Sequence, residues 1–93
     1  MKKTERAVLT VIGVDRTGII AKLSNTLYDN EVNIIDIQQN IQQDLFTMIM
    51  MVDVSSSKVD FETLTKAVAK DGEELGVKVL LMHEDIFNAM HRI

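Results

Sequence analysis

Hydrophobic residues recur along this chain at two spacings, and the spacing changes from one segment to the next. Alternating apolar and polar positions predict a strand, whereas apolar positions three or four residues apart predict one face of a helix. Ile20, Leu23 and Leu27 form such a helical face, and the alternation is clearest between Val32 and Gln43. The predicted strands span residues 6–14, 32–43, 45–54 and 77–83, and the predicted helices span residues 18–30, 59–76 and 84–93.

The predicted elements follow the order β-α-β-β-α-β, with one further helix at the C-terminal end. This order is that of the α+β, ferredoxin-like fold, a four-stranded antiparallel sheet with two helices on one face. Right-handed crossovers place the first and third strands in the middle of the sheet and the other two at its edges. We expect Asp60 to cap the start of the second helix and Gly76 to end it.

The second and third strands are expected to pair as a hairpin around a two-residue turn at Gln43–Asp44. Because side chains alternate between the two faces of a sheet, this register assigns every pair to one face. The pairs expected under the helices are Ile41–Phe46, Gln39–Met48, Ile37–Met50 and Ile35–Val52. The pairs expected on the opposite face are Asn40–Thr47, Gln38–Ile49 and Asp36–Met51. The apolar side of the C-terminal helix is expected to cover part of that opposite face, on this chain or on a second one.

The length of 93 residues predicts a single domain over residues 1–93, with a folded core at about 6–83 and a tail helix at 84–93. Hydrophobic residues make up 46% of the chain, too many for a disordered segment, and no apolar run approaches the ~20 residues that span a bilayer. The N-terminal residues lack the pattern of a signal peptide. We therefore expect a cytoplasmic protein that has no membrane partner.

Charge and cysteine content narrow the possible chemistry further. The chain has no cysteine, which excludes disulfides and thiol catalysis. The formal net charge of -4, with the basic residues scattered, argues against a nucleic-acid partner. His83 and His91 are too far apart for a helical metal pair, and no nucleophile and base stand in a recognisable pattern. The sequence therefore predicts no catalytic residues, no metal site and no cofactor.

The turn between the first strand and the first helix carries the candidate chemistry. Its sequence, Gly-Val-Asp-Arg-Thr-Gly at residues 13–18, has too few glycines for a phosphate-binding loop. Free N–H groups at the helix start, together with Arg16, suit a carboxylate, and Asp15 suits an ammonium group. The turn therefore matches a free amino acid. The alternative is that Asp15 or Thr17 only caps the helix.

The segment VIGVDRTGIIAKLSNTLYDNEVNIIDI, residues 11–37, resembles the first half of an ACT domain. The tail HEDIFNAMHRI is similar to that of short, stand-alone single-ACT-domain proteins of uncharacterised function. The resemblance implies a regulatory module of the kind that often binds an amino acid between two subunits. It differs from many members at Thr17, where they have proline. The implied ligand-binding residues are Asp15, Arg16, Thr17, Gly18 and Ile19 of one chain and Asn33, Ile34 and Ile35 of its neighbour.

Three functional hypotheses follow from these observations. The first is a regulatory homodimer, or a higher oligomer, that binds a small-molecule amino acid ligand and acts on another protein without catalysis of its own. The second is a structural dimerisation or protein-interaction module with no ligand, in which Asn33 serves only turn chemistry. The third is a small hydrolase of the acylphosphatase type, whose Gly-Val-x-Phe-Arg signature this chain lacks.

Overall fold

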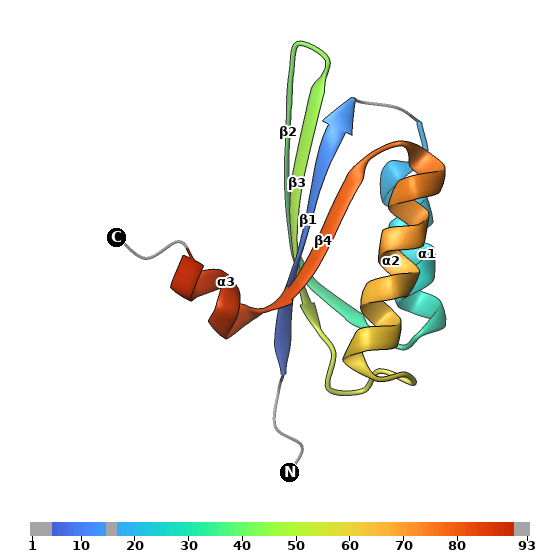
Figure 1. Cartoon of the computed structure of the whole chain (residues 1–93), viewed down its shortest axis with the longest axis vertical. Coiled ribbons are helices and arrows are strands. Elements are labelled where there is room, and N and C mark those ends of the chain that lie inside the picture. The colour runs from blue at the N-terminus through green and yellow to red at the C-terminus, as the bar shows by residue number, and fades with distance from the viewer. Residues whose placement is uncertain (1–4, 15–16, 91–93) are drawn as a thin grey trace.

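The computed structural model describes residues 5–14 and 17–90. This part of the chain forms one four-stranded antiparallel sheet with strand order β2-β3-β1-β4. Helices α1 and α2 lie on one face of the sheet, and α3 extends from the opposite side (Figure 1). The predicted ferredoxin-like fold, with the first and third strands central, is confirmed. The elements are β1 (Arg6–Val14), α1 (Ile19–Asp29), β2 (Asn33–Gln42), β3 (Leu45–Asp53), α2 (Phe61–Leu75), β4 (Lys78–His83) and α3 (Glu84–Met90).

The hydrophobic core lies between the sheet and the helices α1 and α2. Alternate residues of β1 and β3 point into it, and both helices contribute one apolar stripe each. We call this side of the sheet the helix-covered face and the other side the open face. The largest fully buried side chains of the core include Leu9, Leu23, Leu27, Met48, Met50 and Leu64. The two buried methionines therefore serve packing.

Two glycines allow unusually close contacts around Val77, the residue before β4. A Cβ atom added to Gly13 would lie 2.6 Å from Cγ1 of Val77 and 2.9 Å from its Cβ. A Cβ atom added to Gly72 would lie 2.7 Å from Cγ2 of Val79 and 2.9 Å from the carbonyl oxygen of Val77. Real Cβ contacts are not this short, so β1 and α2 approach the start of β4 only because both positions are glycine.

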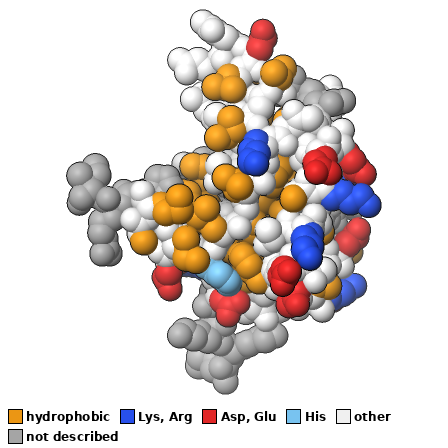
Figure 2. Space-filling model, in the orientation of Figure 1, with side chains coloured by type: hydrophobic (Ala, Val, Ile, Leu, Met, Phe, Trp, Pro, Cys, Tyr) orange, Lys and Arg blue, Asp and Glu red, His pale blue; other side chains and the backbone are white. Residues whose placement is uncertain are grey.

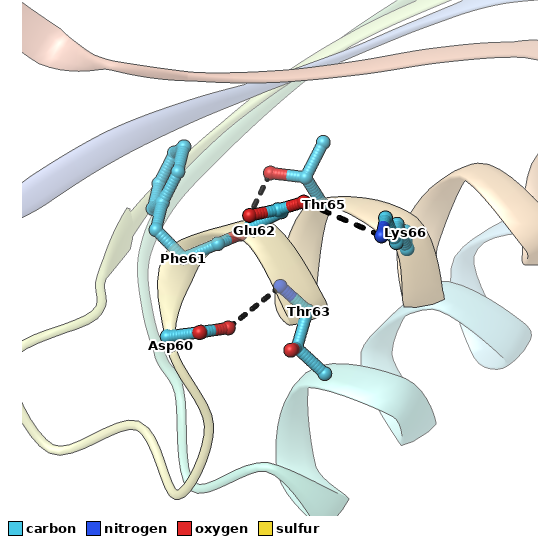
Figure 3. A network of polar contacts seen from close by, with 6 residues as sticks. All are labelled: Asp60, Phe61, Glu62, Thr63, Thr65 and Lys66. Carbon is cyan, nitrogen blue, oxygen red and sulfur yellow. Dashed lines mark hydrogen bonds and ion pairs between the residues drawn. The ribbon is translucent and has the colours of Figure 1, made fainter.

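Helix α2 begins and ends where the sequence predicts. The Asp60 carboxylate accepts a hydrogen bond of 2.8 Å from the backbone N–H of Thr63, which caps the helix (Figure 3). Bonding with Thr63 lowers the pKa of Asp60 below its usual value. One turn on, Lys66 pairs with Glu62 at 3.3 Å. At the other end, Gly76 has φ of 74°, the left-handed conformation that terminates a helix.

The β2–β3 hairpin has the predicted turn and, over most of its length, the predicted register. Every pair from Asp36–Met51 to Ile41–Phe46 is confirmed. In the turn, Gln43 takes φ of 58°, a role usually filled by glycine or asparagine. One predicted pair is wrong, because a bulge after Ile34 pairs that residue with Val52 in place of Ile35.

The edge strand β2 is far more exposed than the register suggests. Ile37 and Ile41 face the same way as the buried residues of β3, yet they are 38% and 53% exposed. Ile35, the bulge residue, is 44% exposed. The expectation that the helices cover these side chains is wrong, because α2 packs over β4 at the other edge of the sheet and the β2–β3 hairpin reaches past the ends of both helices (Figure 1). Among the described residues, no helix is both long and apolar enough to cross a membrane.

Candidate functional site

The turn from β1 into α1 ends at a helix start that no described side chain caps. Asp15 and Arg16 lie outside the described residues, and Thr17 and Gly18 are exposed. Gly18 occupies the N-cap position with φ of 92°, and a Cβ atom there would meet nothing within 4 Å. The Thr17 hydroxyl makes no hydrogen bond with any described residue, so Thr17 is not the capping group.

The start of α1 carries backbone donors that have no partner within the helix. Lys22 is the first helix residue whose N–H bonds back into the helix, at 2.9 Å from the Gly18 carbonyl oxygen. The N–H groups of residues 19–21 precede it and have no acceptor within the helix. The first turn also contains no acidic side chain. The helix dipole therefore leaves partial positive charge at this end, which favours an anion.

A pocket of about 220 Å³ lies beside this helix start, between α1 and the hairpin end of β2 and β3. Its lining combines backbone donors, one amide side chain and apolar side chains. This combination suits a small ligand with a carboxylate and an apolar part. The lining residues are Gly18, Ile19, Ile20, Ala21, Gln39, Ile41 and Phe46.

Gln39, Ile41 and Phe46 are site residues that the sequence analysis does not assign to the turn. The signal for them was present in the predicted register, which puts these three side chains on the helix-covered face. The pairing of Gly13 with Phe46 brings the hairpin end of the sheet, and with it these three residues, to the turn. That pairing depends on how β1 and β3 align, and no local pattern encodes it.

The second set of predicted site residues lies at the other end of β2. Asn33 pairs with Asp53 and Ile34 with Val52, whereas Ile41 of the pocket pairs with Phe46. Eight residues of strand separate Asn33 from Ile41, a span of about 26 Å. Asn33 and Ile35 are exposed, and Ile34 packs partly against the core. A single chain therefore does not bring the two predicted halves of the site together.

Other polar groups of the described residues serve to position the helices. Asp71 of α2 is buried and accepts a hydrogen bond from the hydroxyl of Thr26 in α1. Beside it, Lys22 and Glu74 form an ion pair of 2.8 Å, and the hydrogen bond from Lys22 lowers the pKa of Glu74. Both contacts join α1 to α2 and so fix the two helices relative to each other. No group of three His, Cys, Asp or Glu side chains among the described residues could hold a metal ion.

The fold is that of an ACT domain. The sequence model of the ACT domain matches residues 5–81, and the chain belongs to this family. ACT domains are commonly regulatory, ligand-binding modules.

The relatives are proteins of similar size. A UPF0237 protein of Methanocaldococcus jannaschii is 59% identical over 88 residues, covering 95% of this chain and 98% of that protein. A UPF0237 protein of Listeria monocytogenes is 47% identical over 88 residues, covering 95% and 99%. Among solved structures, an ACT domain protein from Streptococcus pneumoniae is 34% identical with a TM-score of 0.78, covering 91% of this chain and 96% of that one. The predicted resemblance to short single-ACT-domain proteins is confirmed.

Proposed function

We propose that this protein is a regulatory module that binds a free amino acid as a homodimer. The ligand carboxylate lies at the N–H groups that begin α1, and its side chain lies in the pocket against Ile41 and Phe46. Asp15 and Arg16 complete the recognition of the zwitterion from the turn. Residues 33–35 are supplied by the second copy of the chain.

The observation that carries this proposal is the pocket beside the start of α1. The first N–H groups of a helix have no partner within the helix and demand an acceptor from outside it. Here that demand lies beside about 220 Å³ of space with an apolar lining and the amide of Gln39. The positive φ of Gly18 supports the same conclusion, because the absence of a Cβ leaves the backbone open to a ligand.

Isothermal titration calorimetry with each of the twenty amino acids tests the proposal directly. We expect at least one to bind, and we expect Gln39→Ala to weaken that binding at least tenfold. Gln38→Ala is the matched control, because it removes the same side chain from the opposite face of the same strand. Binding that is equally sensitive to both substitutions would place the ligand elsewhere.

Gly18→Val tests the role of the turn in ligand binding while leaving the rest of the fold in place. It forces a β-branched residue into a conformation of positive φ, so we expect ligand binding to be lost while the far-UV circular dichroism stays largely helical and sheet-like. An unaltered ligand affinity in this variant would remove the turn from the site.

A structural dimerisation module without a ligand is the second candidate. It is favoured by the exposed edge of β2, whose apolar side chains and free backbone groups could pair with another chain. A stable dimer that binds none of the twenty amino acids at millimolar concentration would support this candidate over the first.

A further inference from the structure

The open face of the sheet presents an apolar surface to solvent. Alternate residues of β1, β3 and β4 point into the core, so the residues between them face the other way. Five large hydrophobic side chains on this face are between 41% and 67% exposed. They are Ile12, Val14, Leu45, Ile49 and Leu80. Figure 2 shows hydrophobic side chains gathered on the side of the sheet from which α3 leaves, whereas charged side chains gather over α1 and α2.

Polar groups border this apolar surface. On β2 the open face carries a polar row, and an open groove of about 320 Å³ runs between that row and β1. On β4 the exposed Lys78 marks the end nearest α2's C-terminus. An apolar centre with a polar border is the usual composition of a protein interface. The polar row consists of Asp36, Gln38, Asn40 and Gln42.

Helix α3 extends from the open face like an arm, away from the helix layer (Figure 1). Its base is fixed, because His83 stacks on Phe61 with ring centroids 3.8 Å apart and Glu84 pairs with Arg6 at 3.6 Å. The arm contacts β1 and β4, and Val8 on the open face is buried at this end. The expected covering of the open face by the tail is therefore confirmed only at one end.

Two apolar side chains of the arm remain more than half exposed. Ile86 and Met90 are 52% and 66% exposed. A helix of seven residues is about 10.5 Å long, and two packed sheets are about 10 Å apart. The arm is thus as long as the gap that it would cross if a second sheet packed on the open face.

We infer that a second copy of this chain docks open face to open face, with each arm lying against the far end of the partner's sheet. The two-fold axis runs across the strands, so that the arms lie at opposite ends. An axis along the strands would place both arms, with their acidic first turns, at the same end of the dimer. In the arrangement that we propose, the exposed Asp85 at the base of each arm faces, across the gap, the end of the partner's β4 where Lys78 is exposed. The opposite charges favour this orientation.

The area of the open face is too small by itself for a standard interface, so a stable contact requires that the arms take part. The four strands have six to ten residues, and such strands present a face of about 19 by 28 Å, or on the order of 500 Å². A standard interface buries about 800 Å² on each partner. The outward side of each arm and the strip of partner sheet beneath it supply the remainder. This contact is separate from the β2 edge, so together the two interfaces would form a tetramer.

Sedimentation equilibrium of point variants tests the contact. We expect Ile49→Glu and Leu80→Lys, at exposed sites in the centre of the open face, to halve the mass measured for the unmodified protein. Tyr28→Glu is the control, because Tyr28 is 79% exposed on α1 and its substitution should leave the mass unchanged. An unmodified protein that is monomeric at micromolar concentration, or an unchanged mass for both open-face variants, would overturn the inference.

Charge reversal tests the orientation. We expect Lys78→Glu to weaken self-association at least tenfold, and a second substitution, Asp85→Lys, to restore most of the loss. Failure of the second substitution to restore association would refute the placement of the arms. Amino-acid titration of Ile49→Glu separates this inference from the proposed function, because the pocket beside Gly18 lies on the other face and should keep its affinity.

Discussion

Replacing Gly13 by alanine tests whether the close contact between β1 and the start of β4 requires glycine at this position. The added Cβ would lie 2.6 Å from Cγ1 of Val77, 2.9 Å from its Cβ and 3.1 Å from its Cα. Because two of these atoms belong to or adjoin the backbone, rotation of the valine side chain cannot relieve the overlap. Insertion of a methyl group into a packed site costs about 1–3 kcal/mol.

The unfolded chain offsets part of this loss. Alanine restricts the unfolded state more than glycine does, which returns about 0.4–1 kcal/mol. We therefore expect Gly13→Ala to lower the free energy of unfolding by about 1–2 kcal/mol. For a domain of this size, each 1 kcal/mol lowers the melting temperature by about 4–8 °C. Urea denaturation and thermal melting followed by circular dichroism measure both quantities.

A double-mutant cycle assigns the loss to its cause. Val77→Ala removes the Cγ1 contact but leaves the Cβ, so it should recover part of the Gly13→Ala loss, with a coupling of about 0.5–1 kcal/mol. Gly72→Ala is the matched control, because its added Cβ meets the Val77 carbonyl oxygen and Val79, which Val77→Ala leaves in place. A melting temperature unchanged by Gly13→Ala, or strict additivity of the Gly13 pair, would refute the reasoning.

Three further predictions concern other parts of the fold. Thr26→Val should lower the free energy of unfolding by about 1–3 kcal/mol in urea denaturation, because it leaves the buried carboxylate of Asp71 without its hydrogen bond, whereas Thr26→Ser should be nearly neutral. Asp60→Ala should lower the melting temperature at pH 7. The folded pKa of Asp60 is lowered from 3.8, so its cap stabilises the protein above that pH, and this stabilisation is lost as the pH falls through the folded pKa. The difference in melting temperature between the unmodified protein and the variant should therefore close in acid. Deletion of residues 84–93 should expose Val8 and lower the melting temperature or the mass in solution, and a truncated protein with both values unchanged would show that the tail contributes nothing.

The sequence by itself determined the elements, their order and most of the hairpin register. These features depend on neighbouring residues: apolar spacing for the helices and strands, Asp60 and Gly76 for the limits of α2, and alternation for the pairing of β2 with β3. It also located the turn that ends at Gly18, because glycine at a strand-to-helix junction is a local signal.

Only the tertiary structure decided how those elements meet. The exposure of Ile37 depends on where the helix layer ends, and no pattern within β2 records that position or the bulge before Asp36. The placement of Gln39 in the same pocket as the start of α1 depends on the alignment of β1 with β3. The need for glycine at residue 13 arises from a chain segment 64 positions away, at Val77, and such distances between distant segments are set by packing of the whole core.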